Sequence, residues 1–315
     1  MLNAIARRTI AGAAVVTSAA ALTVWAAGQA AAVGSPTGFG AGTTGGGTAT
    51  PVTVTTSTAL ISAMQSSSPA VVRVSGMITI SGMQRVAANK TIIGVGSSSG
   101  IVGGGLNVRG VSNVIIQNLN FRGSSDDAIN VETSTRVWID HNTLSAAHDG
   151  LVDIKHAADF VTVSWNRFFN HDKTMLLGHS DNNASEDRGH LRVSYHHNWF
   201  DGTNQRHPRV RFGNPVHVYN NYYGGVTSYG VASTLEGGTL VEGNYFDNSR
   251  DAFHCGEGSS PPGALVARNN TLVNSAGSTS GCTGSVNGIP YSYTLDPSAN
   301  VKSIVTSGAG VGKVA

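Results

Sequence analysis

Short runs of alternating apolar and polar residues, each with an Asn near its end, recur through the middle of the chain. They span 114–118, 137–142, 161–166, 191–198, 216–221, 240–244 and 265–270. Their closing Asn residues are separated by 24, 24, 32, 23, 23 and 26 positions. Alternation with period two is typical of β-strands, and a repeat of this length is typical of stacked supersecondary units. The pattern therefore predicts an all-β solenoid, a parallel β-helix in which each coil stacks on the one before it.

Each coil of about 23 residues has room for three short strands and the turns between them. Further β-branched runs at 71–74, 77–80 and 91–95 extend the predicted strands toward the N-terminus. One short helix is expected over 56–64, with Thr56 or Ser57 as its cap and Leu60, Ile61 and Met64 as its apolar stripe.

The recurring Asn residues are predicted to be structural, forming a ladder whose side-chain amides bond to neighbouring coils and turns. This ladder comprises Asn142, Asn166, Asn198, Asn221, Asn244 and Asn270. The regular spacing of these Asn residues also predicts which residues of successive coils become neighbours. Asp149 lies seven positions after Asn142, and Lys173 lies seven after Asn166. Arg206 follows Asn198 by eight positions, so the three ionisable residues are expected side by side on successive coils.

A group of carboxylates is predicted at the same place. In the run 149–155, alternation puts Asp149, Asp153 and Lys155 on one face and Val152 and Ile154 on the other. Asp140, just before Asn142 on the preceding strand, is expected to converge on the two other aspartates. Like charges grouped on neighbouring strands repel unless a cation holds them, and three hard oxygen donors suit Ca²⁺ better than a softer metal.

Cations are predicted beside these carboxylates. Lys173 comes from the run 171–178, and Arg206, Arg209 and Arg211 come from the run 206–213. Pro208 interrupts the latter run, so alternation alone does not decide whether both Arg206 and Arg211 point toward the site. Calcium, carboxylates, Lys and Arg together suit a polyanion that carries its own carboxylates.

Residues 1–32 have the pattern of a secretory signal peptide: Arg7 and Arg8, an apolar stretch, then small residues before Val33. An uncleaved membrane anchor is the alternative, but the apolar run is short for a span of about 20 residues. Removing two of the 20 Lys and Arg leaves 18 against 18 Asp and Glu, so the mature chain is formally neutral. We therefore expect a secreted, extracellular monomer that binds no nucleic acid and, once cleaved, no membrane.

The rest of the chain is expected to form one domain over 51–315, because the repeat runs on without a linker-like break. Residues 33–50 are rich in Gly and Thr, which is compatible with either a flexible linker or an ordered extension. Cys255 and Cys282 are the only cysteines, and in an exported chain they are expected to form a disulfide.

Six sequence runs, taken together and in order, resemble the pectate lyases of the first polysaccharide lyase family. They are VWIDHN (137–142), DGLVDIK (149–155), HDKTMLLG (171–178), YHHNWF (195–200), RHPRVRFG (206–213) and VHVYNNYY (216–223). The resemblance covers residues 52–275. It implies a right-handed parallel β-helix that cleaves de-esterified α-1,4-polygalacturonate by β-elimination with Ca²⁺.

The resemblance also implies roles for individual residues. Asp140, Asp149 and Asp153 match the family's calcium ligands, and a further calcium carboxylate of some members would fall at Trp138. Arg206 matches the arginine that acts as the base, and Lys173 matches the lysine near the substrate carboxylate. Lys155 and Arg211 match cations that bind the substrate.

Three other functions stay open. A pectin lyase would use the same fold on methyl-esterified polymer without calcium. A polygalacturonase would hydrolyse the polymer, and Asp126-Asp127 and Gly178-His179 superficially resemble its fragments, although the surrounding motif order is missing. A non-catalytic β-helix that binds cell-wall polysaccharide would need neither Lys173 nor Arg206. The histidines at 171, 190, 196, 197 and 207 lack an HExxH context and are expected to make structural hydrogen bonds.

Overall fold

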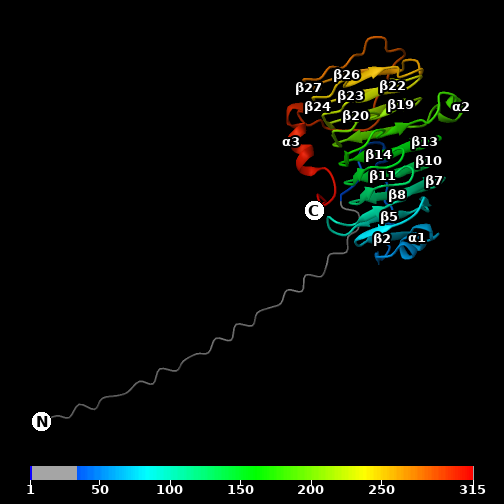
Figure 1. Ribbon diagram of the computed structural model, residues 1–315, viewed down its shortest axis with the longest axis vertical. Helices are drawn as coiled ribbons and strands as arrows, with labels where there is room; N and C mark the ends of the chain where they lie inside the picture. The colour runs from blue at the N-terminus through cyan, green and yellow to red at the C-terminus, as the bar shows by residue number, and fades with distance from the viewer. Residues whose placement is uncertain (2–33, 315) are drawn as a thin grey trace.

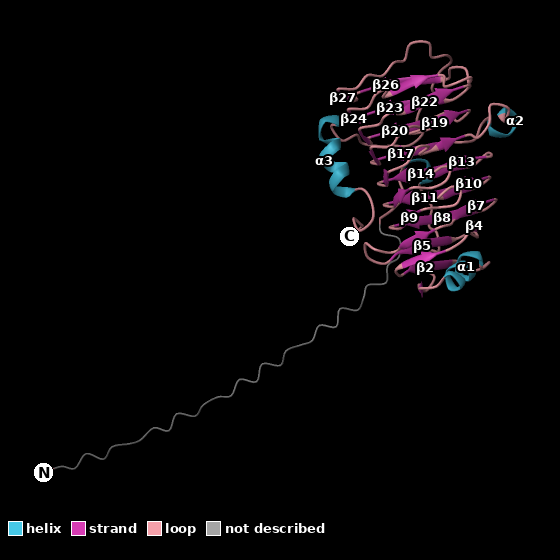
Figure 2. Ribbon diagram, viewed as in Figure 1, coloured by secondary structure: helices cyan, strands magenta, loops and turns pink. Residues whose placement is uncertain are grey.

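The computed structural model describes Met1 and residues 34–314. The predicted signal peptide therefore lies, apart from Met1, outside the described residues. The described chain forms a parallel β-helix with three sheets along its length (Figures 1 and 2). This confirms the predicted fold class.

The three sheets contain ten, eight and nine strands, and we name them by these numbers. The ten-stranded sheet comprises β1 (Val52–Val54), β2 (Ala70–Val74), β5 (Lys90–Gly94), β8 (Ser112–Gln117), β11 (Thr135–Asp140), β14 (Asp159–Ser164), β17 (Val193–His196), β20 (Val216–Tyr219), β23 (Gly238–Glu242) and β26 (Ala264–Arg268). The eight-stranded sheet comprises β4 (Met83–Arg85), β7 (Gly105–Arg109), β10 (Ile129–Glu132), β13 (Val152–Lys155), β16 (Leu176–Leu177), β19 (Arg209–Arg211), β22 (Val231–Thr234) and β25 (Phe253–Cys255). The nine-stranded sheet comprises β3 (Met77–Thr79), β6 (Gly100–Val102), β9 (Asn120–Arg122), β12 (Thr143–Ser145), β15 (Arg167–Phe169), β18 (Trp199–Asp201), β21 (Tyr222–Gly224), β24 (Tyr245–Asp247) and β27 (Thr271–Val273).

Equivalent residues of successive coils pair in register, as the repeat predicted. Val114, Val137, Val161 and Val193 are Cα partners along the ten-stranded sheet, and all four side chains are fully buried. Because side chains alternate across a strand, one apolar position per coil is enough to build a continuous internal row. These rows fill the interior and fix which polar residues point outward.

The Asn ladder is present. Asn142 Nδ2 donates to Asn166 Oδ1 at 3.0 Å, and the same contact continues through Asn198, Asn221 and Asn244 to Asn270. Each of these amides also bonds to backbone of the preceding coil, as Asn142 does with the carbonyl of Ile116. The predicted structural role of these residues is confirmed.

A helix covers the N-terminal end of the solenoid. α1 (Ser57–Gln65) begins after Thr56, whose hydroxyl accepts a hydrogen bond from the Ala59 amide. Leu60 and Met64 are fully buried against the first coil. The predicted helix, its cap and its apolar stripe are therefore confirmed. By covering the first coil, α1 also shields a sheet edge that would otherwise be open to pairing with another strand.

Residues 34–50 form an ordered extension on the outer face of the ten-stranded sheet, so the alternative of a flexible linker is wrong for the described part. A 3₁₀ turn, η1 (Gly38–Gly40), places the Phe39 amide 3.0 Å from Ser194 Oγ and the Gly40 amide 2.9 Å from Thr162 Oγ1. Further along, the Gly46 amide donates to Thr91 Oγ1. The small residues of this segment let its backbone lie directly on the sheet.

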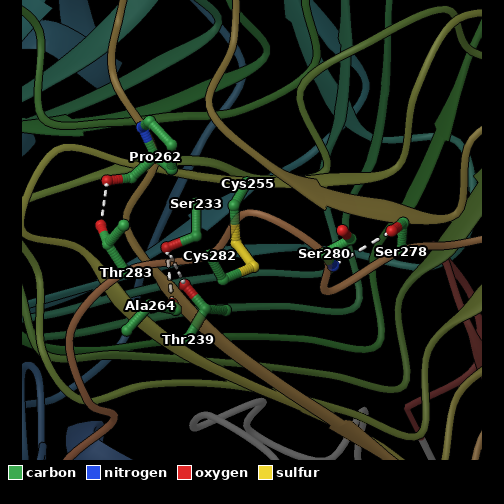
Figure 3. Close-up of a disulfide and its surroundings, with 9 residues drawn as sticks. All are labelled: Ser233, Thr239, Cys255, Pro262, Ala264, Ser278, Ser280, Cys282 and Thr283. Atoms are coloured by element: carbon green, nitrogen blue, oxygen red, sulfur yellow. Dashed lines mark hydrogen bonds between the residues drawn. A yellow bond between two sulfur atoms is a disulfide. The ribbon is translucent and has the colours of Figure 1, made fainter.

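The C-terminal part closes over two other faces. The predicted disulfide joins Cys255 at the end of β25 to Cys282 (Figure 3). α3 (Ser298–Gly308), which the sequence pattern did not reveal, lies along the nine-stranded sheet (Figure 1). There Val301 and Val305 are buried against Tyr222. A four-residue helix, α2 (Ala184–Asp187), projects from the loop after β16.

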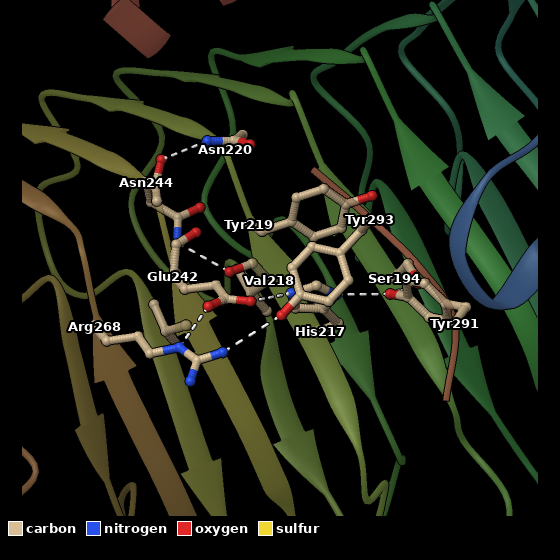
Figure 4. A network of polar contacts seen from close by, with 12 residues as sticks. Ser194, His217, Val218, Tyr219, Asn220, Glu242, Asn244, Arg268, Tyr291 and Tyr293 are labelled. Carbon is tan, nitrogen blue, oxygen red and sulfur yellow. Dashed lines mark hydrogen bonds and ion pairs between the residues drawn. The ribbon is translucent and has the colours of Figure 1, made fainter. Parts of the chain in front are cut away.

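A buried polar network covers the outer face of the ten-stranded sheet near its C-terminal end (Figure 4). His217 lies at its centre, 2.9 Å from Glu242 and 2.7 Å from the Tyr291 hydroxyl. Arg268 donates to Glu242, and Tyr291 also bonds to Ser194. This network ties the segment before α3 to the sheet. None of the described helices has the length and apolar character needed to cross a membrane.

Candidate active site

The outer face of the eight-stranded sheet carries the ionisable residues that the Asn spacing predicted to be neighbours. On β13, Val152 and Ile154 are fully buried in the interior, whereas Asp153 and Lys155 point to the opposite face. The predicted alternation is therefore correct over 152–155, whereas Asp149 lies before the strand begins. Asp153 is nevertheless only 3% exposed, because neighbouring side chains and backbone pack around its carboxylate.

Successive coils bring Asp149, Lys173 and Arg206 together just before the N-terminal ends of β13, β16 and β19. Lys173 Nζ lies 3.1 Å from Asp149 Oδ1, and Lys173 forms an isolated parallel bridge with Gln205. The Met175 amide donates to the carbonyl of Arg206 at 2.8 Å, which fixes the height of Arg206 beside Lys173. The charge of Arg206 also acts on Asp149. The three-coil alignment read from the Asn spacing is thus present.

Asp140 does not join this group, and the prediction that it converges on Asp149 and Asp153 is wrong. It ends β11 on the ten-stranded sheet, and all of β12 separates it in the chain from the loop that carries Asp149. Its carboxylate is 1% exposed and accepts hydrogen bonds from Gln117, His141 and Ser164. Trp138 lies on the same strand and donates to Ser164 Oγ at 3.0 Å, so it also belongs to the ten-stranded sheet.

Asp127 takes the place expected for Asp140. Carboxylate oxygens of Asp126, Asp127 and Asp149 all lie within 4.8 Å of one another. Asp127 Oδ1 accepts the Gly150 amide at 2.8 Å, and a Cβ at Gly150 would lie only 2.2 Å from Asp153 Oδ1. Glycine at this position therefore lets the carboxylates of adjacent coils approach.

Burial and mutual repulsion raise the proton affinity of the inner carboxylates. Burial, followed by the nearby charge of Asp127, raises the pKa of Asp153 to about 8, while Lys155 opposes the shift. Burial likewise raises the pKa of Asp127, although Lys155 Nζ lies 3.3 Å from its Oδ2. Two neighbouring buried carboxylates that share a single lysine are suited to a divalent cation.

Asp149 behaves differently because it lies at the exposed edge of the group. Burial would raise its pKa, but Lys173, Arg206 and Lys155 outweigh that effect and hold the pKa below its ordinary value. Asp149 and Lys173 open onto a cavity of about 440 Å³, also lined by His148, Asn170, His171 and Asp172. The His171 ring donates from Nε2 to the carbonyl of Asp149 at 2.7 Å, which is a structural role, as predicted.

The backbone at Arg206 is anchored by a buried histidine. His207 donates from Nδ1 to the carbonyl of Tyr229 at 2.8 Å, and its Nε2 accepts from the hydroxyls of Thr174 and Thr203. Burial lowers the pKa of His207 to about 3, so the ring is neutral and serves as a fixed connector. The Arg206 Nε is buried without a hydrogen-bond partner among the described residues.

Arg211 and the loop after β16 form the other end of this face. Arg211 Nε lies 2.7 Å from Asp181 Oδ1, and its Nη1 donates to the carbonyl of Gly178 at 3.0 Å. Gly178 has φ of +79°, and a Cβ there would lie 2.9 Å from that of Arg211. Arg211 is therefore held tightly, and its charge is compensated by the carboxylate of Asp181, which the Asn spacing did not predict.

A group of carboxylates next to a lysine and an arginine, on a rigid β-helix, has the donors to bind a hard divalent cation and an anionic ligand. Comparison with known proteins agrees. The family model described as "Pectate lyase" matches residues 3–314. The chain therefore belongs to the pectate lyase family.

Named relatives and solved structures support this membership. A pectate trisaccharide-lyase of Bacillus licheniformis is 38% identical over 293 residues, which cover 87% of this chain and 84% of the relative. A probable pectate lyase B of Aspergillus flavus is 43% identical over 220 residues, 67% of each chain. A pectate lyase from Bacillus sp. N165, solved in complex with trigalacturonate, matches with a TM-score of 0.81 and 32% identity. That match covers 89% of this chain and all of the other.

Proposed function

We propose that the protein is a secreted pectate lyase that cleaves (1→4)-α-D-galacturonan by β-elimination. The product would carry a 4-deoxy-α-D-galact-4-enuronosyl group at its non-reducing end. The observation that carries this proposal is the alignment of the carboxylates at 126, 127 and 149 with Lys173 and Arg206 on successive coils.

The donor set fits calcium. Three carboxylates within ligand-to-ligand reach, with Asp153 behind them, supply the hard oxygen ligands that Ca²⁺ prefers. We propose that Asp127, Asp149 and Asp153 hold the ion, with Asp126 at the exposed side. When bound, the ion would draw negative charge from the substrate carboxylate and so make the proton on C5 easier to remove.

Arg206 is the proposed base. It removes the proton from C5 of the galacturonate, the electron pair forms the C4–C5 double bond, and the C4–O bond breaks. Water protonates the leaving oxygen. Because a guanidinium must first lose its own proton to act in this way, turnover should rise toward alkaline pH.

Lys173 is proposed to stabilise the negative charge that develops on the carboxylate of the reacting sugar. Its position beside Asp149 and the cavity places an ammonium group at the mouth of the site. Lys155 and Arg211, which the family resemblance assigns to substrate binding, lie at the C-terminal ends of β13 and β19, and they form ion pairs with Asp127 and Asp181. An extracellular location follows from the signal-peptide pattern of residues 1–32.

One assay separates the candidate functions. The protein is incubated with polygalacturonate and with methyl-esterified pectin, each with calcium and with a chelator, and ultraviolet absorbance of the unsaturated product is followed. A pectate lyase gives calcium-dependent absorbance on polygalacturonate. Calcium-independent absorbance on the ester would indicate a pectin lyase, reducing ends without absorbance would indicate hydrolysis, and binding without either would indicate a non-catalytic module.

A further inference from the structure

The run 206–211 contains three arginines whose environments differ. Arg211 is 8% exposed and forms an ion pair with Asp181. Arg206 and Arg209 are half-buried, and neither has a carboxylate within ion-pair distance among the described residues. Asp149 interacts with Arg206, and Glu257 and Asp181 interact with Arg209, only at longer range. Of these two arginines without a direct ion pair, only Arg206 has been given a role.

Arg209 is held in place by neutral acceptors. Its Nη2 donates to Ser260 Oγ at 2.8 Å and to the carbonyl of Glu257 at 3.1 Å. Its Nε is buried and has no hydrogen-bond partner in the described structure. The guanidinium is therefore oriented in advance but retains unused donor capacity, which is the arrangement expected of a receptor for a carboxylate.

The pair formed by Asp181 and Arg211 supports this orientation. Asp181 accepts hydrogen bonds from Ser260 Oγ at 2.8 and 2.7 Å and from Arg211 Nε at 2.7 Å. Ser260 therefore bridges Asp181 and Arg209. This chain of contacts joins the loop after β16 to the loop after β25. Asp181 forms its direct ion pair with Arg211, and its charge also acts on Arg209 at longer range.

Strand register places Arg209 within reach of the same polymer chain as the carboxylate group. Arg209 pairs with Leu176 on β16, and Leu177 pairs with Ile154 on β13. Arg209 thus lies two strands along the sheet from Asp153, a separation of roughly 10 Å. A galacturonan crossing the sheet at Lys173 and Arg206 can present a second uronate carboxylate to Arg209.

We propose that Arg209 is a substrate-binding residue that takes the carboxylate of a sugar next to the reacting one. The proposal rests on the proposed function of this site. It follows from the absence of a direct ion pair at Arg209 among the described residues. The Arg209 guanidinium is held by the neutral acceptors Ser260 and the Glu257 carbonyl, whereas Arg211 is already bonded to Asp181.

The test compares Arg209→Gln and Arg209→Lys with Arg188→Gln as the control. Arg188 follows α2 in the loop after β16 and pairs with Glu236 at the exposed surface. Losing a charge-assisted bond to the substrate should raise KM for polygalacturonate by about tenfold in Arg209→Gln, with kcat within about threefold of wild type. Arg209→Lys should recover part of the loss, and Arg188→Gln should leave both constants unchanged.

Binding is measured separately, as retardation in gels containing polygalacturonate with calcium, with thermal melting as the check on folding. Weaker retardation of Arg209→Gln at an unchanged Tm supports the proposal, whether or not the protein turns the polymer over. A KM and a retardation within twofold of wild type would overturn it. If the wild-type protein gives no unsaturated product but Arg209→Gln still loses retardation, the proposed function fails and the binding role of Arg209 stands.

Discussion

The ammonium of Lys173 lies 3.1 Å from the carboxylate of Asp149, although 24 residues separate them in the chain. The contact exists because one coil of the β-helix lies between the two positions. It puts a cation directly beside the proposed calcium ligands, so the substrate carboxylate would meet a metal and an ammonium together.

Replacing Lys173 tests the role of this cation. Lys173→Met should lower kcat by about 10²-fold, the usual cost of removing one electrostatic stabiliser of a transition state. The matched control is Lys302→Met, which breaks another lysine ion pair, that with Asp247 on the face covered by α3. Steady-state kinetics at saturating calcium measure both variants. Equal kcat values for the two would contradict the assignment.

Two single substitutions, one at Asp127 and one at Asp140, test which of these aspartates is a calcium ligand. Asp127→Asn should weaken calcium binding by about tenfold or more, because it removes a ligand from the group. Asp140→Asn should leave calcium affinity unchanged and lower the free energy of unfolding by about 2 kcal/mol, because its carboxylate accepts three hydrogen bonds in the ten-stranded sheet. Calorimetric titration with calcium alone reads the first effect, and thermal melting reads the second. The reverse pattern would restore Asp140 as a ligand.

The buried network at His217 predicts acid sensitivity. Burial lowers the pKa of His217 to about 4, against an ordinary value near 6.5, even though Glu242 opposes the shift. Between these values the unfolded chain binds more protons, so the stabilisation is fully present above pH 6.5 and is lost as the pH falls toward 4. The loss amounts to about 3 kcal/mol.

Thermal melting of wild type and His217→Gln between pH 7 and 4.5 checks this prediction. The variant should be less stable at pH 7, because it removes the contacts with Glu242 and Tyr291, but its Tm should change less with pH. Burial would raise the pKa of Glu242, but hydrogen bonds with Arg268, Tyr293 and His217 outweigh burial and hold the pKa below its ordinary value, so the variant also loses part of this effect. An identical Tm-versus-pH curve for both proteins, offset only in height, would rule out His217 as the source.

The disulfide predicts a stability effect without a catalytic one. The disulfide between Cys255 and Cys282 closes a loop with a sequence separation of 27. Removing this bond should lower the free energy of unfolding by about 3 kcal/mol, because the unfolded chain gains entropy. Cys255→Ser/Cys282→Ser should therefore melt at a lower temperature than wild type while keeping kcat at 25 °C. A large fall in kcat at a temperature where the variant is fully folded would mean that the disulfide also shapes the site.

Most of the fold follows from the period of the sequence. The Asn ladder runs through six successive coils and the valine row through four, so a few equivalent positions determine the register of their neighbours. α3 was missed because it belongs to no coil; its burial of Val301 and Val305 depends on a surface that exists only once the nine-stranded sheet has formed.

The residues whose positions were deduced from the Asn spacing lie together in the structure, whereas Asp140, which was not placed by that spacing, lies elsewhere. Asp149, Lys173 and Arg206 all follow a ladder Asn by seven or eight positions. Asp126 follows Asn118 by eight, so the same rule extended by one coil would have found the Asp126-Asp127 pair. Asp140 was expected to converge on the site because it lies two residues before Asn142 on the preceding strand of the same coil, and the family motif agreed. It ends β11, however, and so lies on the ten-stranded sheet. Asp181 comes from a loop insertion, which no repeat can position.

The proposed mechanism depends most directly on Arg206 as the base. The decisive measurement is the turnover number of Arg206→Lys on polygalacturonate at saturating calcium across alkaline pH, with circular dichroism and calcium titration to establish an intact fold and metal site. Loss of turnover by about 10³-fold, with calcium affinity unchanged, is the predicted result. A turnover number close to that of wild type at its optimal pH would contradict the account.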